Sequence, residues 1–142
     1  MRRKLALALY YAVPLLVLLG GIGDLAITEL LETQRAFLSG QGAYPIPPPA
    51  ERAFIELLHA MAGGLVAVGA SGLLLTHFGI RAGQRWAAVA LLIAILCSEG
   101  ANTVGMYLLG SPFYMVTGTY VALILVATAL AFAPTFAFAE AR

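Results

Sequence analysis

The sequence predicts an all-α protein, a four-helix transmembrane bundle that forms one domain over residues 1–142. Three observations lead there. Hydrophobic residues make up 61% of the 142 residues. Charged residues make up only 11%, against about 25% in soluble domains. The apolar residues gather into four stretches, each long enough to cross a hydrocarbon layer of roughly 30 Å, which takes about 20 helical residues. Runs this long fit helices, because a helix satisfies its own backbone groups in lipid.

The four predicted spans cover about residues 5–27, 53–78, 86–108 and 114–139. The first follows Arg2-Arg3-Lys4 and is rich in leucine, a pattern that signal peptides share. No clear small-x-small cleavage site follows it, so we expect a retained span. Pro14 and Pro134 fall inside the first and fourth spans, and each is predicted to kink its helix because it removes a backbone hydrogen bond.

A long external connection is predicted between the first two spans, over about residues 28–52. Its first part, Glu29 to Leu38, mixes apolar and charged residues, and is expected to extend the first helix or to lie on the membrane surface. The Tyr44–Pro49 segment is proline-rich and is expected to form a stiff, extended strap. Whether this strap covers a pocket is left open.

Basic residues predict the orientation of the spans. One side of the predicted membrane carries six of the eight basic residues: Arg2, Arg3, Lys4, Arg81, Arg85 and Arg142. The other side carries only Arg35 and Arg52. The positive-inside rule therefore places both termini in the cytoplasm. The formal net charge of +1 gives no basic surface, so nucleic acid is not an expected partner and the lipid bilayer is.

Polar residues inside three of the spans mark the candidate site. Glu56 and His59 lie three residues apart in the second span, and Glu99 and Asn102 do the same in the third. Each pair therefore shares one helix face. Asp24 lies near the outer end of the first span. Because charge in hydrocarbon is costly, these faces are predicted to turn inward and to meet.

Depth supports this convergence. At a rise of about 1.5 Å per residue, Glu56 lies roughly 6 Å and His59 roughly 10 Å below the outer boundary. Glu99, counted from the inner side, also lies roughly 10 Å from that boundary. Tyr107 lies near the outer end of the third span. The predicted polar cluster in the outer leaflet is Asp24, Glu56, His59, Glu99, Asn102 and Tyr107, which Thr103, Thr117, Thr119 and Tyr120 could join.

Several functions fit such a cluster. It could be a satisfied structural network, a pocket for a small amphipathic ligand, or support for a partner membrane subunit or a second copy of the chain. A membrane enzyme or redox-linked accessory could use it for acid–base or metal chemistry on a lipid-like substrate, and a proton-coupled small transporter would also need a buried acid. Whether the chain is an enzyme is left open.

No metal or other cofactor is expected. Glu56, His59 and Glu99 are the candidate ligands, since Glu-x-x-His is half of the di-iron bundle motif. The matching position on the third span is Asn102, where that motif would need a second histidine.

In layout the chain resembles the small bacterial four-helix membrane proteins of the DoxX-like group. The resemblance rests on size, on four spans, and on His59-Ala60-Met61-Ala62-Gly63-Gly64 continuing to Gly69 in the second span. It covers the chain as topology only, and Ser98-Glu99-Gly100-Ala101-Asn102 has no counterpart there. It implies an integral protein of a bacterial plasma (inner) membrane, and some members of the group are linked to redox partners. No functional residue carries over from it.

Overall fold

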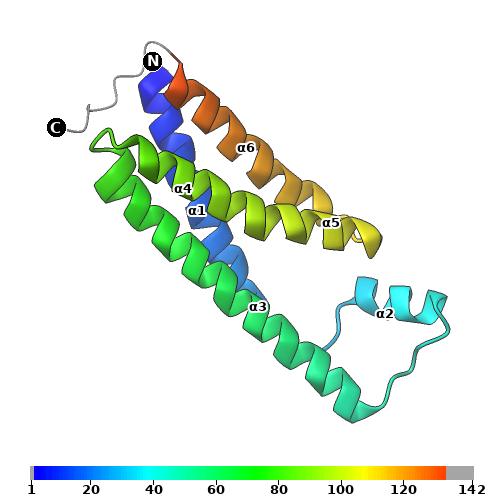
Figure 1. The fold of residues 1–142 in the computed structure, drawn as a ribbon. Helices are drawn as coiled ribbons and strands as arrows, with labels where there is room; N and C mark the ends of the chain where they lie inside the picture. The colour runs from blue at the N-terminus through cyan, green and yellow to red at the C-terminus, as the bar shows by residue number, and fades with distance from the viewer. Residues whose placement is uncertain (1, 134–142) are drawn as a thin grey trace.

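The computed structural model describes residues 2–133, which are helical throughout apart from short connections. The elements are α1 (Arg2–Asp24), α2 (Glu32–Gly40), α3 (Pro48–Leu74), η1 (Leu75–Ile80), α4 (Arg85–Ile95), η2 (Leu96–Gly100), α5 (Ala101–Leu108) and α6 (Tyr114–Phe132). The two η elements are π-helical turns that extend α3 and join α4 to α5 (Figure 1). No strand occurs in this described part of the chain, which confirms the all-α class.

Four continuous helical segments are long and apolar enough to cross a membrane. They are Arg2–Asp24, Pro48–Ile80, Arg85–Leu108 and Tyr114–Phe132. Large hydrophobic side chains on their outer surfaces, such as Leu19, Ile93 and Leu108, are exposed in the isolated chain. Lipid tails would cover such surfaces, so the four segments indicate an integral membrane protein.

The boundaries of the predicted spans shift at the long connection. The first helix ends at Asp24 rather than near residue 27, and the second begins at Pro48, five residues before the predicted start. Pro48 and Pro49 open α3 because the first helical turn needs no backbone N–H donors. The predicted extended strap therefore ends at Pro47, and the connection contains the separate helix α2.

The end of the predicted fourth span, residues 134–139, lies outside the described residues. The same holds for the predicted kink at Pro134 and for Arg142. The described part of the fourth span, α6, is 19 residues long, or about 28 Å at the usual helical rise.

The hydrophobic core is formed by buried residues of α1, η1, α4 and α6. Tyr10, Val13 and Val17 of α1 are buried, together with Leu91 and Ile95 of α4 and Ile124 of α6. A Cβ placed on Gly69 would lie 2.6 Å from the Leu18 backbone nitrogen, so α3 and α1 touch backbone to backbone there. Two such close helices gain dispersion contacts, which drive helix association in lipid.

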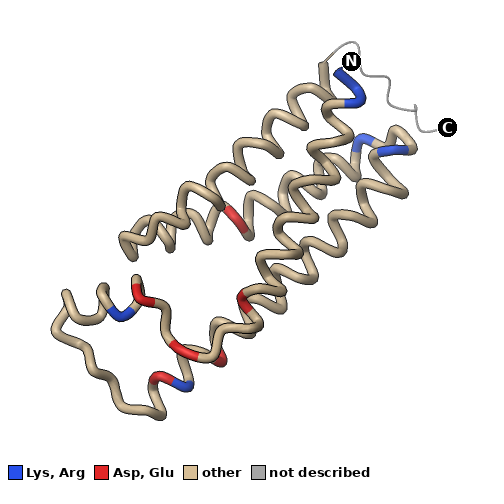
Figure 2. The backbone as a smooth tube through the Cα atoms, turned by 180° about the vertical axis from the view of Figure 1, so that it is seen from behind, with Lys and Arg blue, Asp and Glu red and all other residues tan. Residues whose placement is uncertain are grey.

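Charge separates along the molecule. Lys and Arg gather at the end where the N-terminus lies, whereas most Asp and Glu lie at the opposite end with the remaining arginines (Figure 2). A single acidic position lies on the third span between the two ends (Figure 2). It is Glu99, which is 2% exposed.

The helices diverge toward the acidic end. Contacts between α3–η1 and the third span concentrate at η1 and α4, while α5 contacts α6 and η2. In Figure 1, α5 and α3 accordingly run apart, and α2 lies near the open side. This divergence leaves the space in which the candidate site lies.

Candidate functional site

Three of the predicted polar residues come together between the two ends, where the helices begin to diverge. Asp24 is the last residue of α1 and is half-buried, as is Asn102 on α5. The Asn102 side chain hydrogen-bonds the Glu99 carboxyl, and the Glu99 and Asp24 carboxyls are close enough to interact electrostatically. The structure thus brings Asp24, Glu99 and Asn102 into one cluster from two spans.

A cavity that we name the α3–α5 cleft lies on one side of this cluster. Its volume is about 510 Å³. It is lined by Asp24, Gln34, Leu58, Met61, Gly64, Leu65, Val68, Cys97, Ser98, Ala101, Asn102, Gly105, Met106 and Leu109. Most of these groups are apolar, and the volume falls within the roughly 300–1,000 Å³ typical of ligand sites.

A second cavity, which we name the α1–α6 pocket, lies on the other side of the cluster. Its volume is about 370 Å³. It is lined by Val17, Gly20, Asp24, Ile27, Leu31, Leu65, Glu99, Asn102, Met106, Phe113, Val116, Thr117 and Tyr120. Asp24, Leu65, Asn102 and Met106 line both cavities. The two spaces therefore adjoin each other at an acid, an amide and two apolar side chains.

The backbone holds Glu99 in an unusual local structure. Glu99 lies in η2, a π-helical turn in which Ser98 Oγ donates a hydrogen bond to the Ala94 carbonyl at 2.9 Å. Thr103 Oγ1 donates to the Glu99 carbonyl at 2.6 Å and lies 2.9 Å from Thr117 Oγ1 on α6. π-Helical turns recur at functional sites because they change the direction of side chains within a helix. Here the turn and the threonine pair hold the Glu99 backbone beside α6.

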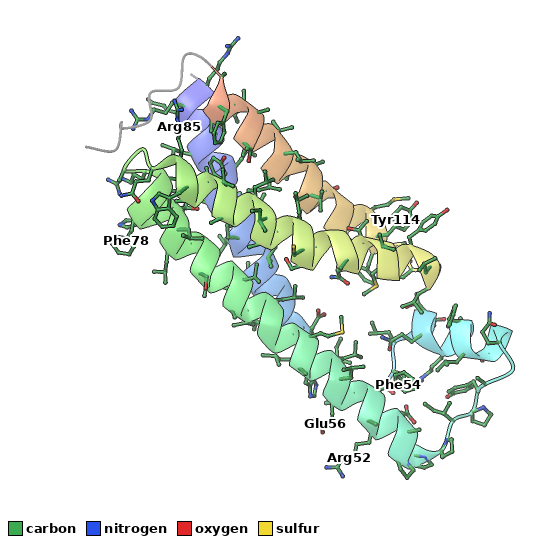
Figure 3. All side chains as sticks on the ribbon, viewed as in Figure 1. Arg52, Phe54, Glu56, Phe78, Arg85 and Tyr114 are labelled. Atoms are coloured by element: carbon green, nitrogen blue, oxygen red, sulfur yellow. The ribbon has the colours of Figure 1, made fainter. Side chains whose placement is uncertain are left out.

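Glu56 and His59 do not join the cluster. Glu56 is exposed and projects from the side of α3 that faces away from α5 (Figure 3). His59 Nε2 lies 2.7 Å from the Ile27 carbonyl, to which it donates. Both line a separate surface groove with Thr28, Glu51 and Arg52.

Helix rotation explains this separation. The side of α3 that packs on α1 carries Ala62, Leu65 and Gly69. At about 100° per residue, Glu56 lies about 120° around the helix from Ala62. The i,i+3 spacing of Glu56 and His59 correctly indicates one shared face, but that face meets the connection after α1 instead of the third span.

Tyr107 is also outside the cluster. Its side chain is 66% exposed. Its ring packs edge-on against Tyr114, with the ring centroids 5.5 Å apart. This contact ties the end of α5 to the start of α6 and brings no hydroxyl to either cavity.

The metal candidates do not converge either. Among residues 2–133, no group of three or more His, Cys, Asp or Glu side chains lies close enough to hold a metal ion. Glu56 and His59 share the surface groove, whereas Glu99 lies in the α1–α6 pocket.

The apolar walls of the two cavities are not predicted by the sequence. Gly64 and Gly105 have the spacing of helix-packing residues, yet a Cβ on either would meet nothing within 4 Å, and both line the α3–α5 cleft. Leu31 and Gln34, at the start of α2, are not among the predicted site residues. The small residues Ala101 and Gly105, one turn apart beside Asn102, are the sequence feature that could have indicated this wall of the α3–α5 cleft.

Comparisons with known proteins give no further guide. No protein-family model matches the chain, and no curated protein and no solved structure matches it either.

Proposed function

We propose that the chain is an integral membrane protein that binds a small amphipathic ligand between its diverging helices. In this proposal the four spans form a transmembrane bundle with both termini in the cytoplasm, and the site lies in the outer leaflet. The membrane is the plasma membrane of a bacterium, which the resemblance in layout to the DoxX-like proteins implies. The polar head of the ligand lies at Asp24, Glu99 and Asn102, and its apolar part fills the α3–α5 cleft.

The main support for the proposal is that two cavities adjoin each other at one polar cluster. The α3–α5 cleft is walled mainly by Leu, Met, Val and small residues, while the α1–α6 pocket contains Glu99. An apolar chamber that adjoins a polar one matches the two halves of an amphiphile. Glycine at positions 64 and 105 leaves room in the cleft, since both line it and an added Cβ on either would meet nothing within 4 Å.

The acid–base alternative has less support. A proton shuttle needs a base and an acid within hydrogen-bond reach of one substrate. His59 is held by the Ile27 carbonyl and lines neither of the two cavities. A proton-coupled transporter would need only Glu99 or Asp24, and it would still have to bind its substrate in these cavities.

Cys97 provides a reporter for the test. It is the single cysteine of the sequence, it is exposed, and it lines the α3–α5 cleft. The purified protein in phosphatidylcholine nanodiscs would be alkylated with a membrane-permeant maleimide, with and without dodecyl amphiphiles of neutral, cationic or anionic head group. We expect at least one amphiphile to slow alkylation of Cys97 about tenfold at a concentration of about ten times its dissociation constant.

Two controls make the result specific. Gly64→Leu fills the cleft and should abolish the protection, whereas Gly63→Leu, on a residue that lines neither cavity and has open space around it, should leave it intact. A double variant with Cys97→Ser and Ser71→Cys reports from a different cavity, beside Phe78 and Trp86, and should show no protection. If no amphiphile protects Cys97, or if the cysteine introduced at position 71 is protected equally, the proposal fails.

A further inference from the structure

The described walls of the two cavities contain two carboxyl groups and no basic side chain. Asp24 and Glu99 line them, and none of the described lining residues is Lys, Arg or His. The ion pair between Arg35 and Glu29, at 2.7 Å, is on the surface, where Glu29 is 74% exposed. Nothing in the described walls therefore neutralises the two carboxyls.

The lack of a basic partner matters most for the buried carboxyl of Glu99. It is 2% exposed, its side-chain partner is the neutral amide of Asn102, and the nearby charge of Asp24 has the same sign. A carboxyl that is removed from water either takes up a proton or needs a counter-charge or a metal to stay ionised. Because the walls supply neither, a ligand that brings a cation would gain from both acids at once.

Aromatic rings line the same chamber. Phe113 and Tyr120 line the α1–α6 pocket together with Glu99. Aromatic faces attract ammonium groups, quaternary ones in particular, because the ring carries negative charge above its plane. Two acids and two aromatic rings together favour an organic cation over a hydrated metal ion, which would need several oxygen ligands in a fixed shell.

We propose that the ligand is a single-chain cationic amphiphile with a substituted ammonium head. The head lies in the α1–α6 pocket between Asp24 and Glu99, and the alkyl chain passes Leu65 and Met106 into the α3–α5 cleft. This inference rests on the proposed function and adds the charge of the ligand to it.

The test compares three head groups on one alkyl chain. Dodecyltrimethylammonium, dodecanol and dodecanoate are added to the protein in phosphatidylcholine nanodiscs, and half-protection of Cys97 is expressed as the concentration of each compound in the membrane. We expect half-protection by the cation at a concentration about tenfold below that of dodecanol, and protection by dodecanoate to be the weakest.

Two substitutions test whether the cationic head group binds at Glu99 and Asp24. In each of the variants Glu99→Gln and Asp24→Asn, the half-protection concentration of dodecyltrimethylammonium should come to within about twofold of that of dodecanol measured on the same variant. Glu56→Gln removes a carboxyl that lies in the separate surface groove and should keep the wild-type preference. Each variant is first required to show the wild-type melting profile. If neither acid variant folds, the three head groups on the wild type still decide the question.

The outcomes separate the two proposals. Equal protection by the cation and by dodecanol overturns the cationic ligand and leaves amphiphile binding in place. Protection by none of the three overturns both. A cation preference that survives Glu99→Gln and Asp24→Asn places the cation elsewhere and overturns the assigned head-group site.

Discussion

Gly69 of α3 lies directly against α1. Any other residue at this position would place a Cβ atom against the α1 backbone. An added Cβ would lie 2.6 Å from the Leu18 nitrogen and 2.7 Å from its Cα, and backbone atoms cannot rotate out of the way. We expect Gly69→Ala to destabilise the protein by about 1–3 kcal/mol, the usual cost of overpacking. Unfolding by denaturing detergent, followed by circular dichroism, measures the change.

The matched control for Gly69→Ala is Gly63→Ala. Gly63 is on the same helix, and a Cβ there would meet nothing within 4 Å. It should unfold within about 0.5 kcal/mol of the wild type, as surface substitutions usually do. Equal losses of stability in the two variants would show that the α1–α3 contact does not depend on Gly69.

Gly64 and Gly69 show what the sequence can and cannot reveal at this scale. Both fall at spacings typical of helix packing, and only Gly69 packs in that way, whereas Gly64 lines the cleft. Five residues turn a helix by about 140°, so the two glycines cannot both face α1. Spacing gives the angle between two residues, but the direction of the partner helix comes from the whole fold.

Among the elements, α2 is the least supported by packing. It has nine residues, none of them buried, and helices this short are marginal on their own. Its first turn is fixed by the Leu31 N–H, which donates to Gln34 Oε1 at 3.0 Å. Leu31 and Gln34 also line the two cavities, so the start of this helix belongs to the site.

We therefore predict that Gln34→Ala loosens α2 alone. Loss of a capping hydrogen bond costs roughly 0.5–2 kcal/mol, which corresponds to a several-fold or greater increase in local opening. Hydrogen–deuterium exchange with mass spectrometry should show faster exchange in peptides of α2 and unchanged exchange in α3. Thr33→Ala, on a neighbour for which the structure gives no capping bond, is the control. Exchange that speeds up equally in both variants would contradict the role of Gln34.

The sequence predicts the long elements well and the site only in part. Four apolar runs of span length predict four helices because lipid allows few other structures. Asp24, Glu99 and Asn102 can be grouped by depth, since depth follows from residue count. Glu56 cannot be excluded from the sequence, because its direction depends on which face of α3 packs on α1. The π-helical turn at Glu99 has no sequence pattern that would predict it.

The distribution of charge over the whole molecule predicts its orientation in the membrane. Basic residues gather at the end that holds the N-terminus and the loop after η1, while α2 lies at the acidic end (Figures 1 and 2). The positive-inside rule then places the loop after η1 in the cytoplasm and α2 outside. The candidate site, at the same end as α2, would open toward the outer leaflet.

Two uncharged, exposed positions test this orientation without altering the charge bias. Gln41 follows α2, and Ala82 lies in the loop between η1 and α4. In a Cys97→Ser background, a membrane-impermeant maleimide should label Gln41→Cys in intact cells, and should label Ala82→Cys only after lysis. The reverse pattern would place the site in the inner leaflet, and labelling of both in intact cells would show two orientations. Either result would contradict a single orientation with the site in the outer leaflet, because α2 and the cavities that its first turn lines must lie on one side together.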